Sequence, residues 1–152
     1  MIREMEQPPA EDHVEDRLCL TLHKASRAMT ATYRKVLQPL DLTYPQYTVM
    51  SALWQQDPAT VRELGDVLGS DYSTMSPLIK RLEGKALVLR ARNSTDEREV
   101  LVHLTREGRQ LRDRAASVQA DMRRAAGLSR AELDRLVEEL GQLTERLQAF
   151  DG

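Results

Sequence analysis

The chain has a single cysteine, Cys19, among its 152 residues. A lone thiol excludes an intrachain disulfide and a cysteine-based metal cluster. Long hydrophobic runs are missing too, since none approaches the roughly 18 apolar residues that a membrane-spanning helix needs. The N-terminus, Met1 to Glu4, has no apolar signal segment, so we expect a cytoplasmic protein.

Aromatic residues are scarce at 4%, whereas charged residues make up 30%. This balance is typical of a helix-rich domain with polar helix faces, and the chain is long enough for one domain with a sizeable core. The three histidines, His13, His23 and His103, are scattered and have no carboxylate or cysteine companions at ligand spacing. We therefore expect no metal and no cofactor.

The formal net charge of −2 gives no overall basic footprint of the kind that DNA-binding proteins usually carry. The charge is uneven, however, and much of the acid lies near the N-terminus and in the last predicted helix. Between residues 73 and 98 the basic side chains outnumber the acidic ones: Lys80, Arg81, Lys85, Arg90, Arg92 and Arg98 against Glu83, Asp96 and Glu97. This local excess of positive charge suits the segment to bind a polyanion.

Residues 60–105 carry the most informative pattern. Thr60 and Glu63 have the spacing of a capping box, and Gly69 stands where a left-handed residue would end the short helix that follows. A second helix is expected to begin with Ser73 or Thr74 as its N-cap and to have Pro77 near its first turn. Its apolar stripe consists of Met75, Leu78, Ile79 and Leu82.

Two strands, around residues 87–89 and 100–102, flank the polar turn 93–97. Helix, turn, helix and hairpin is the order of a winged helix-turn-helix, whose partner is duplex DNA. We expect the major-groove contacts to come from Ser73, Thr74, Ser76, Lys80 and Arg81.

At the wing, Arg98 is expected to reach the minor groove, with Asp96 orienting it through an ion pair. A plain turn-forming role for Asp96 is the alternative. Arg90 and Arg92 are candidate phosphate contacts or simply solvated charges.

Long helices are expected on both sides of this unit. The first has Asp12 or Asp16 as its cap and extends to about residue 40, and the next begins at Pro45 and places Tyr47 and Trp54 in the core. After the hairpin, a helix is expected from Thr105 through Met122. The last is capped by Ser129 with Glu132 and repeats leucine at residues 133, 136, 140, 143 and 147.

These predictions give a mainly α chain with a small β wing in one domain. Residues 1–12 form a loose arm, residues 13–56 and 106–152 are mainly dimerisation helices, and residues 57–105 form the winged helix-turn-helix. The terminal helices have more apolar surface than one winged domain can cover, which favours a two-fold homodimer on a palindromic operator. The alternative is that both helices pack within one chain.

The chain resembles the MarR family of bacterial regulators from Leu42 to Thr105 and over most of the rest beyond the N-terminal arm. The resemblance rests on Leu78 to Glu83, on the wing phrase Asp96 to Val100, and on the Leu-Thr-x-x-Gly phrase that ends at Gly108. Within that family, Leu18-Cys19, Tyr33 and the phrase Leu42 to Tyr47 are similar to the organic-hydroperoxide resistance regulators. Tyr72 departs from the pattern, because a smaller residue is expected there.

The resemblance implies that Cys19 is a peroxide sensor hydrogen-bonded to Tyr33 and Tyr44 of the other subunit, in a branch without a second, resolving cysteine. From the residues alone, a lone cysteine on a helix is more often a small buried hydrophobe than a reactive group. The spacing is informative: Tyr33 lies 14 residues after Cys19, which places the two within about 40° on one helix face but about 21 Å apart along the axis. They can meet only between two antiparallel copies of the helix.

The sequence thus predicts a dimeric repressor, not an enzyme, that releases DNA when an organic hydroperoxide oxidises Cys19. A low-molecular-weight thiol is a possible second partner of the oxidised cysteine, and no membrane is expected. One alternative is release by a phenolic or aromatic ligand with Cys19 inert. A thiol peroxidase is the less favoured third interpretation, because it would leave the wing without a purpose.

Overall fold

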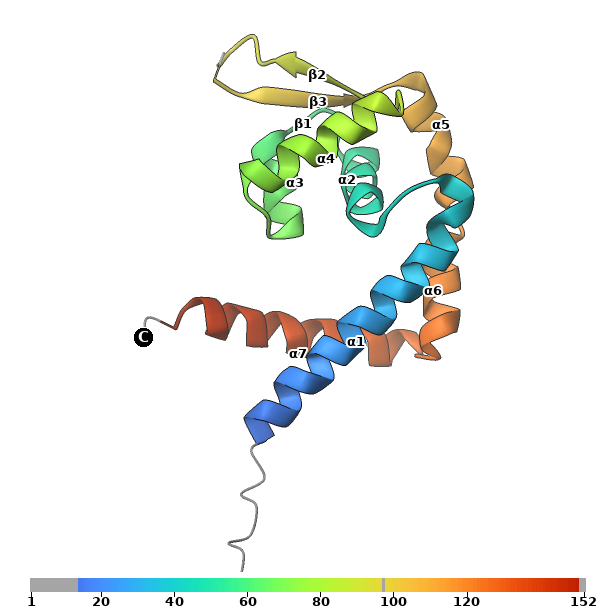
Figure 1. The fold of residues 1–152 in the computed structure, drawn as a ribbon, viewed down its shortest axis with the longest axis vertical. Coiled ribbons are helices and arrows are strands. Elements are labelled where there is room, and N and C mark those ends of the chain that lie inside the picture. The colour runs from blue at the N-terminus through green and yellow to red at the C-terminus, as the bar shows by residue number, and fades with distance from the viewer. Residues whose placement is uncertain (1–13, 97, 151–152) are drawn as a thin grey trace, which may run out of the picture.

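The computed structural model describes residues 14–96 and 98–150 (Figure 1). The elements in chain order are α1 (Val14–Leu37), the 3-10 helix η1 (Gln38–Leu40), α2 (Tyr44–Gln55), β1 (Ala59–Thr60), α3 (Val61–Leu68), α4 (Tyr72–Gly84), β2 (Val88–Arg92), β3 (Val100–Leu104), α5 (Arg106–Ala115), α6 (Val118–Ala126) and α7 (Arg130–Gln148). The predicted class, mainly α with a small β wing, is confirmed. The predicted arm 1–12 lies outside the described residues, as does the candidate cap Asp12.

The three strands form one antiparallel sheet in the order β1-β3-β2. β2 and β3 form the wing hairpin with Val88 opposite Leu104 and Arg92 opposite Val100. β1 adds a two-residue third strand, Ala59 opposite Val102, which the sequence did not predict. This strand attaches the start of α3 to the base of the wing.

The core lies between the helix-turn-helix and the sheet. Its fully buried side chains include Leu53 from α2, Met75, Ile79 and Leu82 from α4, and Val88 and Val102 from the hairpin. α2 packs against α3 and α4 and also against α1 and α5, and the predicted division of the chain into dimerisation helices and a winged unit stays a prediction. The apolar residues Val49, Met50 and Leu53 of α2 are buried.

Three of the predicted helix starts are confirmed. Thr60 and Glu63 form a full capping box at α3, Ser129 and Glu132 form another at α7, and the Thr105 hydroxyl accepts from the Gly108 N–H at α5. Gly69 ends α3 with φ 61°, a left-handed conformation that glycine adopts without strain.

Other predicted boundaries were wrong. Asp16 lies inside α1, which already includes Val14. The helix expected from Thr105 through Met122 is broken at Ala116 and Ser117, giving α5 and α6. No glycine or proline marks that break, so the sequence carried no signal for it.

The outer helices extend away from the winged unit. α1 leaves it diagonally, α6 packs along α1, and α7 crosses α1 near its middle (Figure 1). No side chain of α7 is buried. α1 therefore meets the winged unit at its C-terminal end, and α1 and α7 leave most of their length outside the core of that unit.

Candidate functional site

The recognition helix α4 begins two residues earlier than a Ser73 cap would allow, and three earlier than a Thr74 cap. Its N-cap is Asp71, whose Oδ1 accepts from the Thr74 N–H at 2.9 Å and from the Ser73 hydroxyl at 2.8 Å. Both hydrogen bonds, chiefly the one from the Ser73 side chain, lower the pKa of the Asp71 carboxyl. Ser73 and Thr74 are thus residues of the first turn rather than caps, and Pro77 lies in the second turn, where the Ser73 carbonyl loses its usual helical donor.

The expected groove residues are presented outward by α4. Its opposite face holds the buried Met75, Ile79 and Leu82, which fixes the orientation of the helix. Ser73, Thr74, Lys80 and Arg81 are exposed, and Ser76 is half-buried. An exposed helix face of hydroxyls and cations, standing on a packed apolar face, suits insertion into a major groove.

The wing is tied to the recognition helix by an ion pair. Arg90 of β2 places its Nε 2.7 Å from Oε2 of Glu83 on α4, and its backbone N–H donates to the other carboxylate oxygen. Arg90 was a candidate phosphate contact, but its guanidinium is engaged with this carboxylate. Arg92, the other candidate, is exposed.

In the wing turn, the predicted ion pair between Asp96 and Arg98 is wrong. Among the described residues the Asp96 carboxylate accepts instead from the backbone N–H of Arg98 at 3.0 Å, as in an Asx turn. Asp96 therefore shapes the backbone of the turn. The Arg98 side chain is left exposed.

Two tyrosines of the predicted sensor are in contact. The rings of Tyr33, on α1, and Tyr44, at the start of α2, have centroids 4.5 Å apart. Burial, and then the neighbouring phenols of Tyr44 and Tyr47, raise the pKa of Tyr33. Its hydroxyl consequently stays protonated and able to donate a hydrogen bond throughout the neutral range.

Both rings line a cavity of about 250 Å³. The remaining lining is largely apolar and comes from α1, together with one residue of α7: Leu22, Ala25, Ser26, Met29, Thr30 and Leu140. At 100° per residue, Cys19 lies on the same face of α1 as this lining. The cavity thus extends along α1 from the phenols towards the cysteine.

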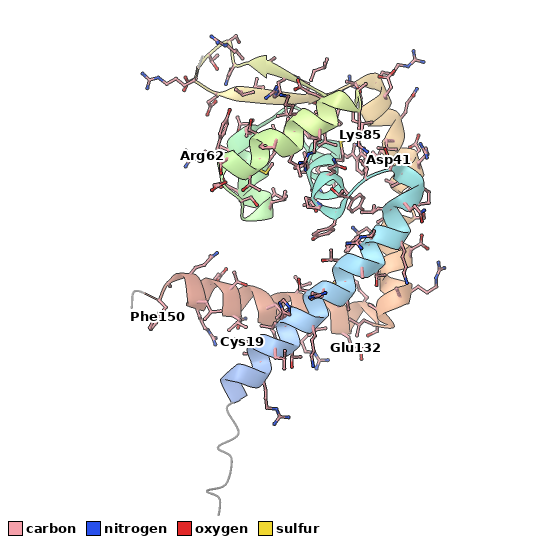
Figure 2. The ribbon with its side chains drawn as sticks, viewed as in Figure 1. Cys19, Asp41, Arg62, Lys85, Glu132 and Phe150 are labelled. Carbon is pink, nitrogen blue, oxygen red and sulfur yellow. The ribbon has the colours of Figure 1, made fainter. Side chains whose placement is uncertain are left out.

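Cys19 is exposed on the first part of α1 (Figure 2). Because α1 is one continuous helix from Val14 to Leu37, Cys19 and Tyr33 of the same chain are separated by about 21 Å along its axis. The structure therefore brings the two tyrosines together within one chain and leaves the cysteine apart from them.

A row of aromatic contacts leads from the tyrosine pair into the winged unit through Tyr47 and Trp54, to which the sequence gave only a core role. The Tyr47 ring has its centroid 6.2 Å from that of Tyr33 and 6.2 Å from that of Trp54, and its hydroxyl accepts from the Gln119 side chain. Trp54 Nε1 donates to the Gly108 carbonyl at 2.8 Å. A Cβ on Gly108 would lie 2.1 Å from the Leu87 carbonyl oxygen, so only glycine fits there.

Several large apolar side chains of α1 and α7 are largely left exposed by the described residues. Leu20 is 53% exposed and Met29 52%, while on α7 Val137 is 64% and Leu147 65% exposed. Leu18, Leu136 and Leu140 are also exposed. In the part of the chain that the structure describes, no helix is long and apolar enough to cross a bilayer.

A winged helix-turn-helix with an exposed polar recognition helix and a wing arginine defines the class of DNA-binding transcriptional regulators. Residues 31–115 match the family described as transcriptional regulator SarA/Rot. The chain belongs to this SarA/Rot and MarR family of winged-helix regulators.

Individual relatives agree with this assignment. The chain is 36% identical over 138 residues to the organic hydroperoxide resistance transcriptional regulator of Bacillus subtilis (strain 168), covering 90% of this chain and 94% of that protein. It is similar to the structure of reduced AbfR bound to DNA, with 30% identity, a TM-score of 0.74, and coverage of 88% of this chain and 93% of that one. AbsC, a MarR family regulator from Streptomyces coelicolor, matches with a TM-score of 0.78 at 25% identity, over 91% and 97% of the two chains.

Proposed function

We propose that this regulator is a homodimeric repressor of a palindromic operator that senses organic hydroperoxides through Cys19. The observation that carries the proposal is the Tyr33–Tyr44 pair in an apolar cavity on the face of α1 that also holds Cys19. The 36% identity to an organic hydroperoxide resistance regulator supports it.

Dimerisation explains how the parts of the sensor meet. The exposed apolar residues of α1 and α7 need a partner surface, and a second copy of these helices supplies one. If the two α1 helices cross antiparallel near Ser26, Cys19 of each subunit lies beside Tyr33 and Tyr44 of the other. Small residues at Ala25 and Ala28 permit the close approach.

The chemistry proceeds in one oxidation step. The Cys19 thiolate attacks a peroxide oxygen, an S–O bond forms as the O–O bond breaks, and the departing alkoxide takes a proton from water to become an alcohol. The thiol is oxidised to a sulfenic acid and the hydroperoxide is reduced. The apolar lining of the cavity favours an organic substituent over hydrogen peroxide.

Without a second cysteine in the chain, the sulfenic acid condenses with a low-molecular-weight thiol, with loss of water, or is oxidised further by another hydroperoxide. Either product is bulkier than the thiolate and ends its hydrogen bonds to the phenols. Since α1 forms both sensor and interface, the change alters the spacing of the two recognition helices. A coupling free energy of about 1–3 kcal/mol is ordinary for such a transition.

Cys19→Ser tests the proposal. Serine keeps the size and the hydrogen-bonding capacity but has no peroxide-reactive thiolate. The variant should bind DNA as wild type does in reducing buffer and remain bound after addition of cumene hydroperoxide. Mass spectrometry of the wild-type protein should show oxygen or a thiol added at Cys19 at the same dose. Release of the serine variant at the wild-type dose would refute the sensor role.

The cavity itself supports a second candidate function. With about 250 Å³ and two phenols in its lining, it could hold a small phenolic or aromatic effector, with Cys19 inert. Parallel titrations of the DNA complex with cumene hydroperoxide and with salicylate distinguish the two. Release by salicylate that persists in Cys19→Ser would favour this alternative.

A further inference from the structure

A hollow of about 210 Å³ lies between the start of α3 and the base of the wing, next to the first residue of the recognition helix. Its lining includes Arg62 from the first turn of α3, Tyr72 at the start of α4, and Arg98 beside the wing strand β3. Arg62 projects outward from the winged unit (Figure 2). Tyr72 is 62% exposed, a large exposed fraction for an aromatic side chain.

The position of this hollow follows the shape of B-DNA. When a recognition helix occupies a major groove and a wing enters the adjacent minor groove, one sugar-phosphate strand runs between the two protein elements. Tyr72 of the recognition helix and Arg98 of the wing both line the hollow, so it borders both of those elements. On a bound duplex, the strand between them, rather than a base edge, would pass over the hollow.

The side chains there suit a phosphate. Among the described residues the guanidinium groups of Arg62 and Arg98 have no hydrogen-bond or ion-pair partner, so both can meet an anion without first breaking a bond. The tyrosine hydroxyl adds a neutral donor. Donors of this kind make the phosphate contacts that fix the register of a protein on DNA.

The carboxylates of Glu63, Asp71 and Glu99, the described acids near the hollow, already accept hydrogen bonds. Glu63 accepts from the Thr60 N–H and hydroxyl at 2.7 and 3.0 Å, and these bonds lower its pKa. Glu99 accepts from the Asn93 side chain at 3.0 Å, and Asp71 caps α4. Each acid is turned to a protein donor, which leaves the arginines facing the solvent.

We propose that Arg62, assisted by the Tyr72 hydroxyl, binds the backbone phosphate of the strand that separates the major-groove and minor-groove contacts. Arg98 remains the residue that enters the minor groove beyond that strand. The proposal assigns a contact to α3 and gives Tyr72, which departs from the family pattern, a role in positioning the DNA. It concerns the reduced protein only and does not depend on peroxide sensing.

The experiment uses the full chain in reducing buffer and a duplex recovered from a random pool by selection for binding. Copies of this duplex carry a single uncharged methylphosphonate at successive backbone positions. Affinity is measured by fluorescence anisotropy over a range of salt concentrations for wild type, Arg62→Ala, Arg62→Lys, Tyr72→Phe and Arg98→Ala. Arg123→Ala, which removes an exposed arginine of α6 far from the wing, is the matched control.

Arg62→Ala should weaken binding at least about tenfold, because a charge-assisted hydrogen bond is lost. The slope of log K against log salt should fall by about 0.9 for each phosphate released, one per subunit. Arg62→Lys should keep most of the slope, Tyr72→Phe should lose a smaller part of the affinity, and Arg123→Ala should match wild type. At one position per half-site, the methylphosphonate should weaken wild type but not Arg62→Ala.

Three results would overturn the proposal. One is an unchanged salt slope in Arg62→Ala. Another is a methylphosphonate penalty at every position that is the same in Arg62→Ala as in wild type. The third is loss of that penalty in Arg98→Ala but not in Arg62→Ala, which would assign the phosphate to the wing arginine. Because Arg62 is exposed, unchanged thermal unfolding should establish that each variant is folded.

Discussion

Lys85, the C-cap of the recognition helix, donates through its ammonium group to both the backbone carbonyl and the carboxylate of Asp41 (Figure 2). Nζ lies 2.6 Å from Oδ2 of Asp41. Asp41 follows η1, with φ 53°, and so marks the end of the α1 segment. A direct polar link thus joins the turn that follows α1 and η1 to the C-terminal end of the recognition helix.

Lys85→Met should lower the free energy of unfolding by about 1 kcal/mol, as loss of one hydrogen bond to a charged group with partial solvent screening would. The Asp41 carboxylate is 92% exposed, so most of the effect should come from the carbonyl bond. Asp41→Asn is the control, since it keeps that bond and should be less destabilising. Urea unfolding followed by circular dichroism measures both, and equal losses would place the energy in the ion pair instead.

Arg98→Ala should weaken operator binding by about 1–3 kcal/mol, because the wing loses its minor-groove contact. The oligomeric state should not change, since the wing lies far from α1 and α7 (Figure 1). Anisotropy at fixed salt and analytical ultracentrifugation check the two statements. Arg123→Ala, which removes an exposed arginine of α6, controls for loss of charge alone, and equal effects of the two would argue against groove entry.

Tyr33→Phe and Tyr44→Phe should each make Cys19 harder to ionise, because each removes a proposed donor to the thiolate of the other subunit. The pH midpoint of alkylation by iodoacetamide should rise by about one to two pH units. Tyr47→Phe is the matched control, because the Tyr47 hydroxyl is bonded to Gln119 within its own chain. Identical alkylation midpoints in wild type and all three variants would mean that Tyr33 and Tyr44 only pack against each other and do not activate Cys19.

Asp71 should make the stability of the recognition helix depend on pH. Hydrogen bonds from Ser73 and Thr74 lower its pKa in the folded state, so its contribution is complete above the unfolded-state pKa, about 4, and is lost as the pH falls through the lower folded-state value. Asp71→Asn retains a capping oxygen that does not titrate. The stability advantage of wild type over Asp71→Asn should therefore shrink between about pH 5 and pH 2 in thermal unfolding, and a constant difference would contradict the assigned cap.

Local chemistry explains which elements the sequence predicted. The capping box of Thr60 and Glu63 and the left-handed Gly69 depend on residues three to nine positions apart, and both are found as expected. The predicted N-cap of α4 was wrong because three good cap residues, Asp71, Ser73 and Thr74, lie within four positions. Only the three-dimensional placement of the turn selects Asp71.

Contacts between segments that lie far apart in the sequence could not be predicted from local sequence patterns. β1 is two residues long and exists only because Ala59 meets Val102. The Glu83–Arg90 ion pair and the row of rings from Tyr33 through Tyr47 to Trp54 depend on how the helices pack. For the same reason the sequence did not indicate that Arg62, on the first turn of α3, lines a hollow together with Tyr72 of the recognition helix and Arg98 of the wing.

The last helix adds a consequence for how the protein behaves in a cell. α7 buries no side chain in its own chain, so in the proposed dimer its order comes from the second subunit. Stability then grows with the amount of protein present, by mass action, and the melting temperature rises with concentration. A newly induced regulator would therefore unfold most readily while its concentration is low, and each molecule would last longer as more protein accumulates.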